Sequence, residues 1–199
     1  SNEALLISLV TASGGNAIPL GIGRDNAIDL SDKIQHGLQH DVLLLSGGVS
    51  MGEKDLVPAL LHQADVMEVF HKVQLKPGKP LWFGQAENTQ SQTLVFGLPG
   101  NPVSSLVCYM LFVAPLIRVF QQGAKGRDSQ PESYAELTVP YTLRGDRPTY
   151  HPGRLEWISG KWSVTPLPWS GSADQQAFAL ANCLVFFQPP QHEYDAGEQ

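Results

Sequence analysis

Three short loops rich in glycine and proline follow apolar, strand-like segments in the first half of this chain, and they constrain its fold more than any other feature. They lie at residues 46–55 (Ser-Gly-Gly-Val-Ser-Met-Gly-Glu-Lys-Asp), 76–80 (Lys-Pro-Gly-Lys-Pro) and 97–105 (Gly-Leu-Pro-Gly-Asn-Pro-Val-Ser-Ser). Open α/β sheets bind ligands beyond the carboxyl ends of their strands. Glycines let the backbone approach a ligand and prolines stiffen the loops. The pattern predicts an α/β fold whose three loops together form a cradle for a phosphate or another oxyanion.

Helical and strand-like patterns alternate around these loops. Apolar periodicity predicts helices at 3–12, 28–39, 56–64 and 102–121, and strands at 17–20, 42–45, 66–75, 81–83 and 94–96. Such alternation is typical of a sheet covered by helices on both faces. We therefore expect a three-layer α/β/α domain with a mostly parallel sheet.

A polar, turn-rich segment at 123–132 separates this domain from a different pattern. Short β-like segments follow at 135–141, 154–158, 161–166 and 183–188, with Ser159-Gly160 as a tight turn. We expect a small all-β domain with Trp157, Trp162 and Trp169 in its core, and a frayed tail after Pro189. The predicted domains are residues 1–124 and 133–199.

Charge and cysteine usage narrow the class of protein. The 199 residues carry a formal net charge of -6 and a pI near 5.4, which argues against nucleic acid as a partner. Cys108 and Cys183 lie in apolar runs without metal-ligand spacing, which favours buried thiols and a cytoplasmic protein. The longest apolar run, 103–119, is interrupted by Pro115 and Arg118, so we expect no membrane span.

The first loop combines anion-binding and metal-binding groups. Backbone N–H groups at Gly47 and Gly48, with the hydroxyls of Ser46 and Ser50, can hold an anion at a helix N-terminus. Two carboxylates follow, at Glu53 and Asp55, and a Mg²⁺ ion between carboxylate and phosphate would relieve their repulsion. The alternative is a tight turn whose two acids complement the helix dipole.

The second loop places Lys76 and Lys79 on either side of a Pro-Gly turn, with Pro80 at its exit. Two converging ammonium groups suit a tetrahedral oxoanion. The alternative is an ordinary solvated turn with two surface lysines.

The third loop carries Pro99, Asn101 as a helix N-cap, Pro102 at the first helical position and Ser104 in the first turn. Helix capping alone explains these residues without a ligand. The presence of three such stiffened loops in one domain favours a ligand-binding site over these structural explanations. In the second domain, Arg154 and Ser172 are the side chains that we expect to reach a ligand.

Taken together, in this order and spacing, the three loops resemble signature segments of the molybdopterin molybdenumtransferase family, of the MoeA and gephyrin E-domain type. The likeness continues through residues 151–156 (His-Pro-Gly-Arg-Leu-Glu) and 171–174 (Gly-Ser-Ala-Asp). The resemblance implies a MogA-like molybdopterin-binding domain followed by the C-terminal β domain of the family.

The resemblance also implies an activity, the insertion of molybdate into adenylylated molybdopterin with Mg²⁺-dependent release of AMP. On that basis Asp55, Lys76 and Lys79 take part in catalysis, and Asp55 and Glu53 hold Mg²⁺. Pro80, Ser104, Arg154 and Ser172 match positions around the molybdate pocket. Whether the oxoanion is molybdate or tungstate stays open, because both are tetrahedral dianions.

Family members carry further domains before this region and act as homodimers. The first strand of the family's pterin-binding domain is absent from this sequence, so we expect a fragment of the full enzyme. Two alternatives stay open: a MogA-like adenylyltransferase that transfers AMP from ATP, and a non-catalytic, gephyrin-like scaffold that binds peptides.

Overall fold

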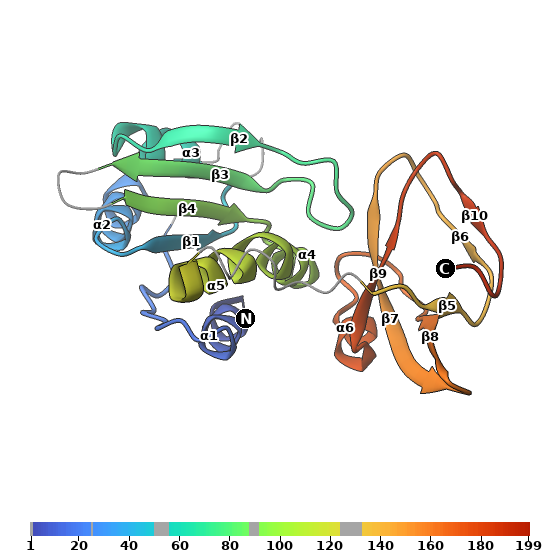
Figure 1. Ribbon diagram of the computed structural model, residues 1–199. Coiled ribbons are helices and arrows are strands. Elements are labelled where there is room, and N and C mark those ends of the chain that lie inside the picture. The colour runs from blue at the N-terminus through green and yellow to red at the C-terminus, as the bar shows by residue number, and fades with distance from the viewer. Residues whose placement is uncertain (1, 25, 50–55, 88–91, 124–132) are drawn as a thin grey trace.

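The computed structural model describes residues 2–24, 26–49, 56–87, 92–123 and 133–199, which form an α/β part followed by a smaller β-rich part (Figure 1). The α/β part contains the helices α1 (Asn2–Ala12), α2 (Ala27–Gly37), α3 (Leu56–Gln63), α4 (Pro102–Cys108) and α5 (Ala114–Gln122), and the π-helical turn η1 (Tyr109–Val113). Its strands are β1 (Val42–Ser46), β2 (Met67–His71), β3 (Trp82–Glu87) and β4 (Gln92–Leu98).

These four strands form one mixed sheet in the order β1-β4-β3-β2. β1 and β4 pair in parallel, whereas β4–β3 and β3–β2 are antiparallel. The α/β class is confirmed, but the expected mostly parallel sheet is wrong. Parallel neighbours need a long crossover, usually a helix, and no helix lies between β2 and β3 in the described chain. The carboxyl ends of β1 and β4 still share one edge of the sheet.

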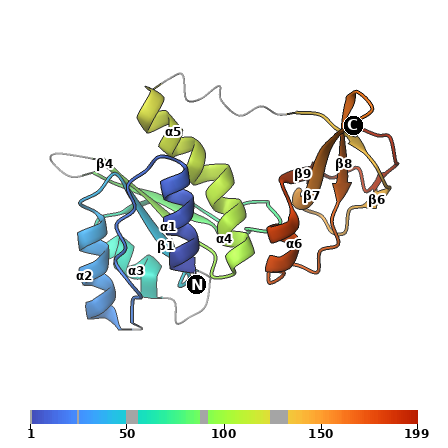
Figure 2. The ribbon, with the colours of Figure 1, turned by 90° about the horizontal axis from the view of Figure 1, so that it is seen from below.

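Helices cover both faces of the sheet, so the predicted three-layer arrangement is confirmed (Figure 2). On one face, Leu6 of α1 and Val113 of η1 belong to a core with Leu98 of β4. On the other face, Ile34 of α2 and Leu61 of α3 are both at most 1% exposed. Burial of these apolar stripes holds the three layers together.

The helical run Pro102–Gln122 is 21 residues long and apolar enough to cross a membrane by length and composition alone. The run matches the helix predicted at 102–121, and Pro115 does not end it because this residue falls in the first turn of α5. Half of its most apolar window is buried inside the protein, and Val107 and Val113 are fully buried. It is a core helix of the α/β part.

The strand expected at 17–20 is absent from the structure. A strand needs a neighbour for its backbone hydrogen bonds. Here the carbonyl of Leu20 instead accepts a hydrogen bond from the Lys33 ammonium, at 3.0 Å.

The C-terminal part is built on two small sheets. β5 (Glu136–Leu137), β8 (Lys161–Pro166), β7 (Thr149–Ile158) and β9 (Cys183–Phe187) form one, and β10 (Glu193–Tyr194) pairs with β6 (Tyr141–Thr142) in the other. A helix, α6 (Gln175–Leu180), lies between β8 and β9. The small β-rich unit is confirmed, and its core contains Leu137, Leu143, Val164 and Phe187.

Two expectations for this part were wrong. The tail is not frayed, because β10 pairs with β6 and the Tyr194 ring lies 4.8 Å from that of Phe187. Trp157 and Trp162 are not core residues; they face each other at 5.2 Å across the β7–β8 hairpin and are 61% and 46% exposed. Their strand positions put both rings on the solvent face as a cross-strand pair.

Candidate functional site

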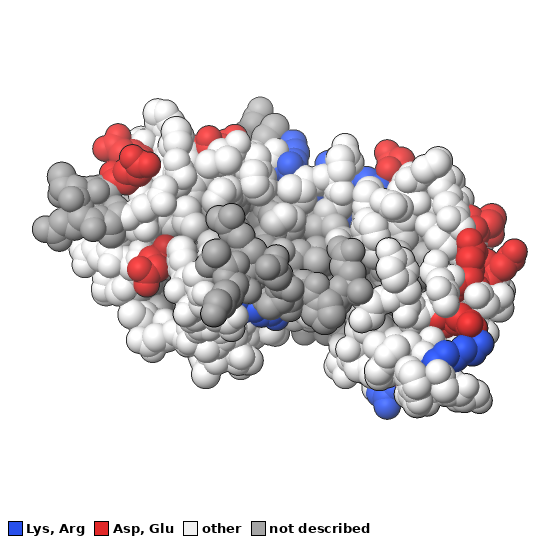
Figure 3. All heavy atoms as spheres, in the orientation of Figure 1, with Lys and Arg blue, Asp and Glu red and all other residues white. Residues whose placement is uncertain are grey.

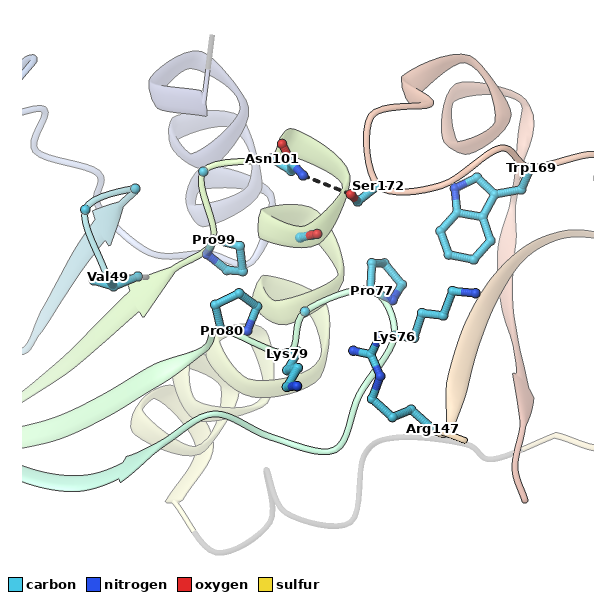
Figure 4. Close-up of a pocket in the computed structure, with 15 residues that line it drawn as sticks. Val49, Lys76, Pro77, Lys79, Pro80, Pro99, Asn101, Arg147, Trp169 and Ser172 are labelled. Atoms are coloured by element: carbon cyan, nitrogen blue, oxygen red, sulfur yellow. Dashed lines mark hydrogen bonds between the residues drawn. The ribbon is translucent and has the colours of Figure 1, made fainter. Parts of the chain in front are cut away.

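A cavity with a volume of about 430 Å³ lies where the α/β part meets the C-terminal part. All three loops and the C-terminal part contribute to its walls (Figure 4). The predicted site residues that line it are Gly47, Gly48, Lys76, Lys79, Pro80, Pro99, Asn101, Ser104 and Ser172, and they are joined by Val49, Pro77, Gly78, Gly100, Arg147 and Trp169. Most of the predicted site thus comes together in one place.

The first loop contributes backbone to the cavity at the end of β1. Gly47 and Gly48 adopt φ values of 85° and 69°, in a region that favours glycine. The Gly47 N–H donates to the carbonyl of Leu98 at the end of β4, at 3.0 Å, which joins the first loop to the third. Ser46 does not line the cavity, and its hydroxyl accepts a hydrogen bond from the Asn2 amide at 2.6 Å. Ser50, Glu53 and Asp55 lie outside the described residues.

The second loop packs against Cys108, a core residue of α4. Gly78 has a φ of 130°, and a Cβ there would lie 2.7 Å from the Cys108 Sγ. The Cys108 thiol donates to the Gly78 carbonyl at 3.6 Å, and burial raises the pKa of this thiol to about 12, so it stays protonated. Pro77 and Gly78 are buried, whereas the side chains of Lys76 and Lys79 line the cavity.

The third loop turns β4 into α4, as the sequence predicts, but Asn101 does not cap the helix with its side chain. Its Nδ2 instead donates to the Ser172 hydroxyl of the C-terminal part at 2.8 Å. Ser104 is 5% exposed and lines the cavity from the first turn of α4. Pro102 begins α4 but is not part of the cavity wall.

The C-terminal part also docks onto the second loop through its backbone. The Lys76 N–H donates to the Pro148 carbonyl at 2.9 Å, and the Tyr150 N–H donates to the Lys76 carbonyl at 2.8 Å. These bonds accompany an isolated parallel bridge between Lys76 and Thr149. Lys76 is therefore part of the junction between the two parts as well as of the cavity.

Arg147 is the arginine among the described lining residues of this cavity. Its Nη1 donates to the Leu75 carbonyl at 3.0 Å, which places the guanidinium beside the second loop (Figure 4). The structure does not bring Arg154 to the cavity: this exposed side chain lies on β7, with its Nε 4.0 Å from a carboxylate oxygen of Glu156. Arg147 had no motif to mark it, because its position depends on how the two parts dock.

Positive charge dominates the described walls of the cavity. Lys76, Lys79 and Arg147 line it, and no Asp or Glu is among its described lining residues. The ion pairs in the described part of the chain involve other residues, at Lys33–Asp29, Arg154–Glu156 and Lys161–Glu136. Figure 3 shows some basic side chains near the junction and others at the far end of the C-terminal part, while most acidic side chains lie toward the two ends of the molecule. Such an arrangement favours an anionic ligand.

The segment that carries Ser172 is tied in place by Asp174. This carboxylate accepts hydrogen bonds from the Ser170 N–H at 3.1 Å and from the Ala177 N–H at 3.2 Å, where it caps α6. These hydrogen bonds, first those from Ser170 and Ala177, lower the pKa of Asp174 below its usual value. The N-cap is the signal that could have predicted α6 from the sequence.

His151 lies behind the cavity wall and is 6% exposed. Its Nε2 lies 2.8 Å from the Leu167 carbonyl, and its Nδ1 lies 3.2 Å from the Tyr141 hydroxyl. Burial lowers the pKa of His151, and the charge of Lys76 lowers it further, against a hydrogen bond to Leu167 that raises it. A neutral ring that donates from Nε2 and accepts at Nδ1 satisfies both contacts. No group of three or more His, Cys, Asp or Glu residues with metal-binding geometry exists within the described ranges.

Comparisons with known proteins agree with this geometry. Residues 1–119 match a family described as "Probable molybdopterin binding domain", and residues 134–199 match "MoeA C-terminal region (domain IV)". The chain is 36% identical to a molybdopterin molybdenumtransferase of Synechocystis sp. over 81% of its own length and 37% of that protein. It is 34% identical to that of Haemophilus influenzae over 91% of its own length and 44% of that protein. The chain thus spans less than half the length of these relatives.

Solved structures show the same fold. Two MoeA proteins from Pyrococcus horikoshii superpose with TM-scores of 0.75 and 0.70, at 25% and 20% identity. The superpositions cover 99% and 100% of this chain, and 46% and 45% of the two MoeA chains. The two family matches, the similar sequences and the similar structures agree, so the chain belongs to the MoeA-type molybdopterin molybdenumtransferase family and comprises its molybdopterin-binding domain and domain IV.

Proposed function

We propose that this chain acts in molybdenum cofactor biosynthesis, and that the cavity binds a tetrahedral oxoanion, molybdate or tungstate, beside adenylylated molybdopterin. Three cationic side chains line the cavity, and no described carboxylate neutralises them; this observation carries the proposal. A doubly negative oxoanion needs both cations and hydrogen-bond donors.

Each part of the molecule has a role in this proposal. Lys76 and Lys79 supply charge from the second loop, and Arg147 supplies a planar set of N–H donors from the C-terminal part. The hydroxyls of Ser104 and Ser172 add neutral donors. Molybdate insertion with release of AMP is then a matter of positioning and of charge neutralisation, and no protein nucleophile is required.

Magnesium belongs to the proposal through Asp55 and Glu53, which lie outside the described residues. The described residues of the cavity wall include no carboxylate, so they do not themselves form a site for this hard cation. Mg²⁺ bound by the first loop would neutralise phosphate charge of the pterin substrate. The remaining first-loop roles, those of Ser46 and Ser50, stay predictions.

We also assign residues 1–124 and 133–199 to two domains, because separate sheets and separate cores support this division. A homodimer of the longer protein and a cytoplasmic location complete the proposal. The C-terminal match to domain IV supports the insertion enzyme over a MogA-like adenylyltransferase.

Calorimetric titration of the chain with molybdate and with adenylylated molybdopterin, with and without Mg²⁺, tests this function, together with an assay for released AMP. Molybdate-dependent release of AMP, or binding of both ligands, supports it. Transfer of AMP from ATP to molybdopterin, or the absence of oxoanion binding, contradicts it.

Lys79→Ala supplies the site-directed control. We expect this variant to weaken molybdate binding roughly tenfold, because it removes one charged donor. Lys161→Ala removes the same charge on the distant β7–β8 hairpin and leaves the affinity unchanged. Equal affinities of the two variants would mean that the oxoanion does not bind in this cavity.

A further inference from the structure

Lys76 has an aromatic partner where a charged residue often has a carboxylate. Its Nζ lies over the indole of Trp169, 5.7 Å from the ring centroid. In Figure 4 the Lys76 side chain extends toward this ring, and both residues line the cavity. The pair joins the second loop to the C-terminal part.

The ring of Trp169 is fixed on several sides. His151 meets it edge-on at 5.3 Å with an interplanar angle of 81°, and Phe178 of α6 lies at 5.8 Å and 70°. The indole N–H donates to the carbonyl of Gly171 at 2.6 Å. The indole face is therefore held in place before any ligand arrives.

An aromatic face has an advantage over a carboxylate at this position. It attracts the ammonium through its quadrupole, and tryptophan is the strongest of the aromatic partners. It does not neutralise the charge, and it offers no lone pair that competes for the ammonium N–H donors. Lys76 thus stays positioned while its full charge remains available to an anion.

We propose that Trp169 is a positioning residue, whose indole face holds the Lys76 ammonium in the orientation that binds the oxoanion. This inference rests on the proposed function. The indole N–H makes a separate contribution, because it donates to the carbonyl of Gly171 and so helps to position the next residue, Ser172. The Ser172 hydroxyl in turn accepts a hydrogen bond from Asn101.

Molybdate titration of Trp169→Phe and Trp169→Leu separates the two contributions. Phenylalanine keeps an aromatic face and loses the N–H, whereas leucine loses both. We expect the leucine variant to bind molybdate roughly 3- to 30-fold more weakly than the phenylalanine variant, as expected for a lost cation–π contact. Trp162→Leu, on the exposed face of the β7–β8 hairpin, is the matched control and leaves the affinity unchanged.

The same pair of variants in a Lys76→Ala background distinguishes positioning from a merely structural effect. If Trp169 acts through Lys76, the difference between phenylalanine and leucine disappears in that background. A difference of the same size in both backgrounds would overturn the proposal.

The contact itself can be measured without a ligand. The ε-methylene proton signal of Lys76, assigned by its loss in Lys76→Ala, is expected to lie upfield because of the indole ring current and to return in Trp169→Leu. An unshifted signal overturns the positioning role even if molybdate binds. A shifted signal in a wild-type chain that binds no oxoanion contradicts the proposed function and leaves the Lys76–Trp169 contact supported.

Discussion

The two walls of the cavity are built on different principles. The α/β wall consists of stiffened loops whose backbone shapes the cavity, with Gly47, Gly48 and Gly78 at positive φ, and the second of these loops also presents the Lys76 and Lys79 side chains. The C-terminal wall is made of side chains, from Arg147, Trp169 and Ser172. The first wall is shaped within its own domain, and the second exists only through docking.

This difference shows where binding specificity is encoded. Backbone loops at strand ends provide N–H groups and a shape that many anions can use. Side chains from a second part add a guanidinium, a hydroxyl and an aromatic face that select among those anions. The variants below probe one wall at a time, from the largest expected effect to the smallest.

Gly78→Ala should have the largest effect on stability and binding, because it disturbs the backbone of the second loop. The new Cβ would lie 2.7 Å from the Cys108 Sγ and 2.9 Å from Leu75, at a φ of 130°. We expect a loss of about 2–4 kcal/mol in the free energy of unfolding, together with a large loss of molybdate binding. Denaturant unfolding and titration measure the two effects.

Gly145→Ala is the matched control for that variant. Gly145 also has a positive φ, 101°, but no atom lies within 4 Å of its added Cβ. It should cost only the backbone strain, about 1–2 kcal/mol, and leave binding intact. If both variants lose the same stability and keep their affinity, the second loop is not the rigid wall described above.

Arg147→Ala tests the side-chain wall. It removes the guanidinium that lies beside the second loop, and we expect molybdate affinity to fall roughly 10- to 100-fold, as for a lost charged hydrogen bond. Arg154→Ala, which removes the same side chain from the outer face of β7, is expected to bind normally. A loss in the Arg154 variant alone would restore the assignment made from the sequence and show that Arg147 is structural.

His151 provides a pH-dependent test of the same wall. Burial, then the charge of Lys76, lowers its pKa below the ordinary value of 6.5, so the folded protein holds it neutral. Below that ordinary value the unfolded chain takes up a proton that the folded chain does not. The free energy of unfolding therefore decreases as the pH is lowered, until the pH reaches the lowered pKa of the folded protein. We expect Tm to decrease from about pH 7 to about pH 5, and His151→Gln to flatten this decrease. An equally steep decrease in the variant would assign the effect to other groups.

Asn101→Ala should have the smallest effect, because it removes one exposed hydrogen bond between the two walls, at 2.8 Å. We expect about 0.5–1.5 kcal/mol in binding or stability. In a cycle with Ser172→Ala, the two losses should not add, since the residues share one bond. Additive losses would mean that each residue contacts the ligand independently.

Much of the α/β part could be predicted from the sequence, because its elements are long and strongly periodic. Helix α1 and strand β1 appear within about one residue of their predicted bounds. Strand direction could not be read from these patterns, which is why the sheet was expected to be mostly parallel. The same apolar segment suits either direction, and only the connections and the packing decide.

The C-terminal part was harder to predict, because its elements are short. β7 begins at Thr149 rather than at 154, the start predicted from the sequence. The prediction started too late because Pro152 and Gly153 are typical of a turn, whereas here they lie in the middle of the strand. The order β5-β8-β7-β9 buries Val164 and Phe187 but leaves the Trp157 and Trp162 rings in solvent. Local composition could not distinguish these tryptophans from core residues.

By itself, the sequence determined the three loops, their glycines and prolines, and the lysines of the second loop, because strand ends, turns and positive φ values depend on local residue types. Only the tertiary structure decided that Arg147 rather than Arg154 joins them, that Asn101 bonds to Ser172 and that Trp169 lies under Lys76. Contacts between residues about 70 to 90 positions apart depend on how two cores dock, and no local pattern records that geometry.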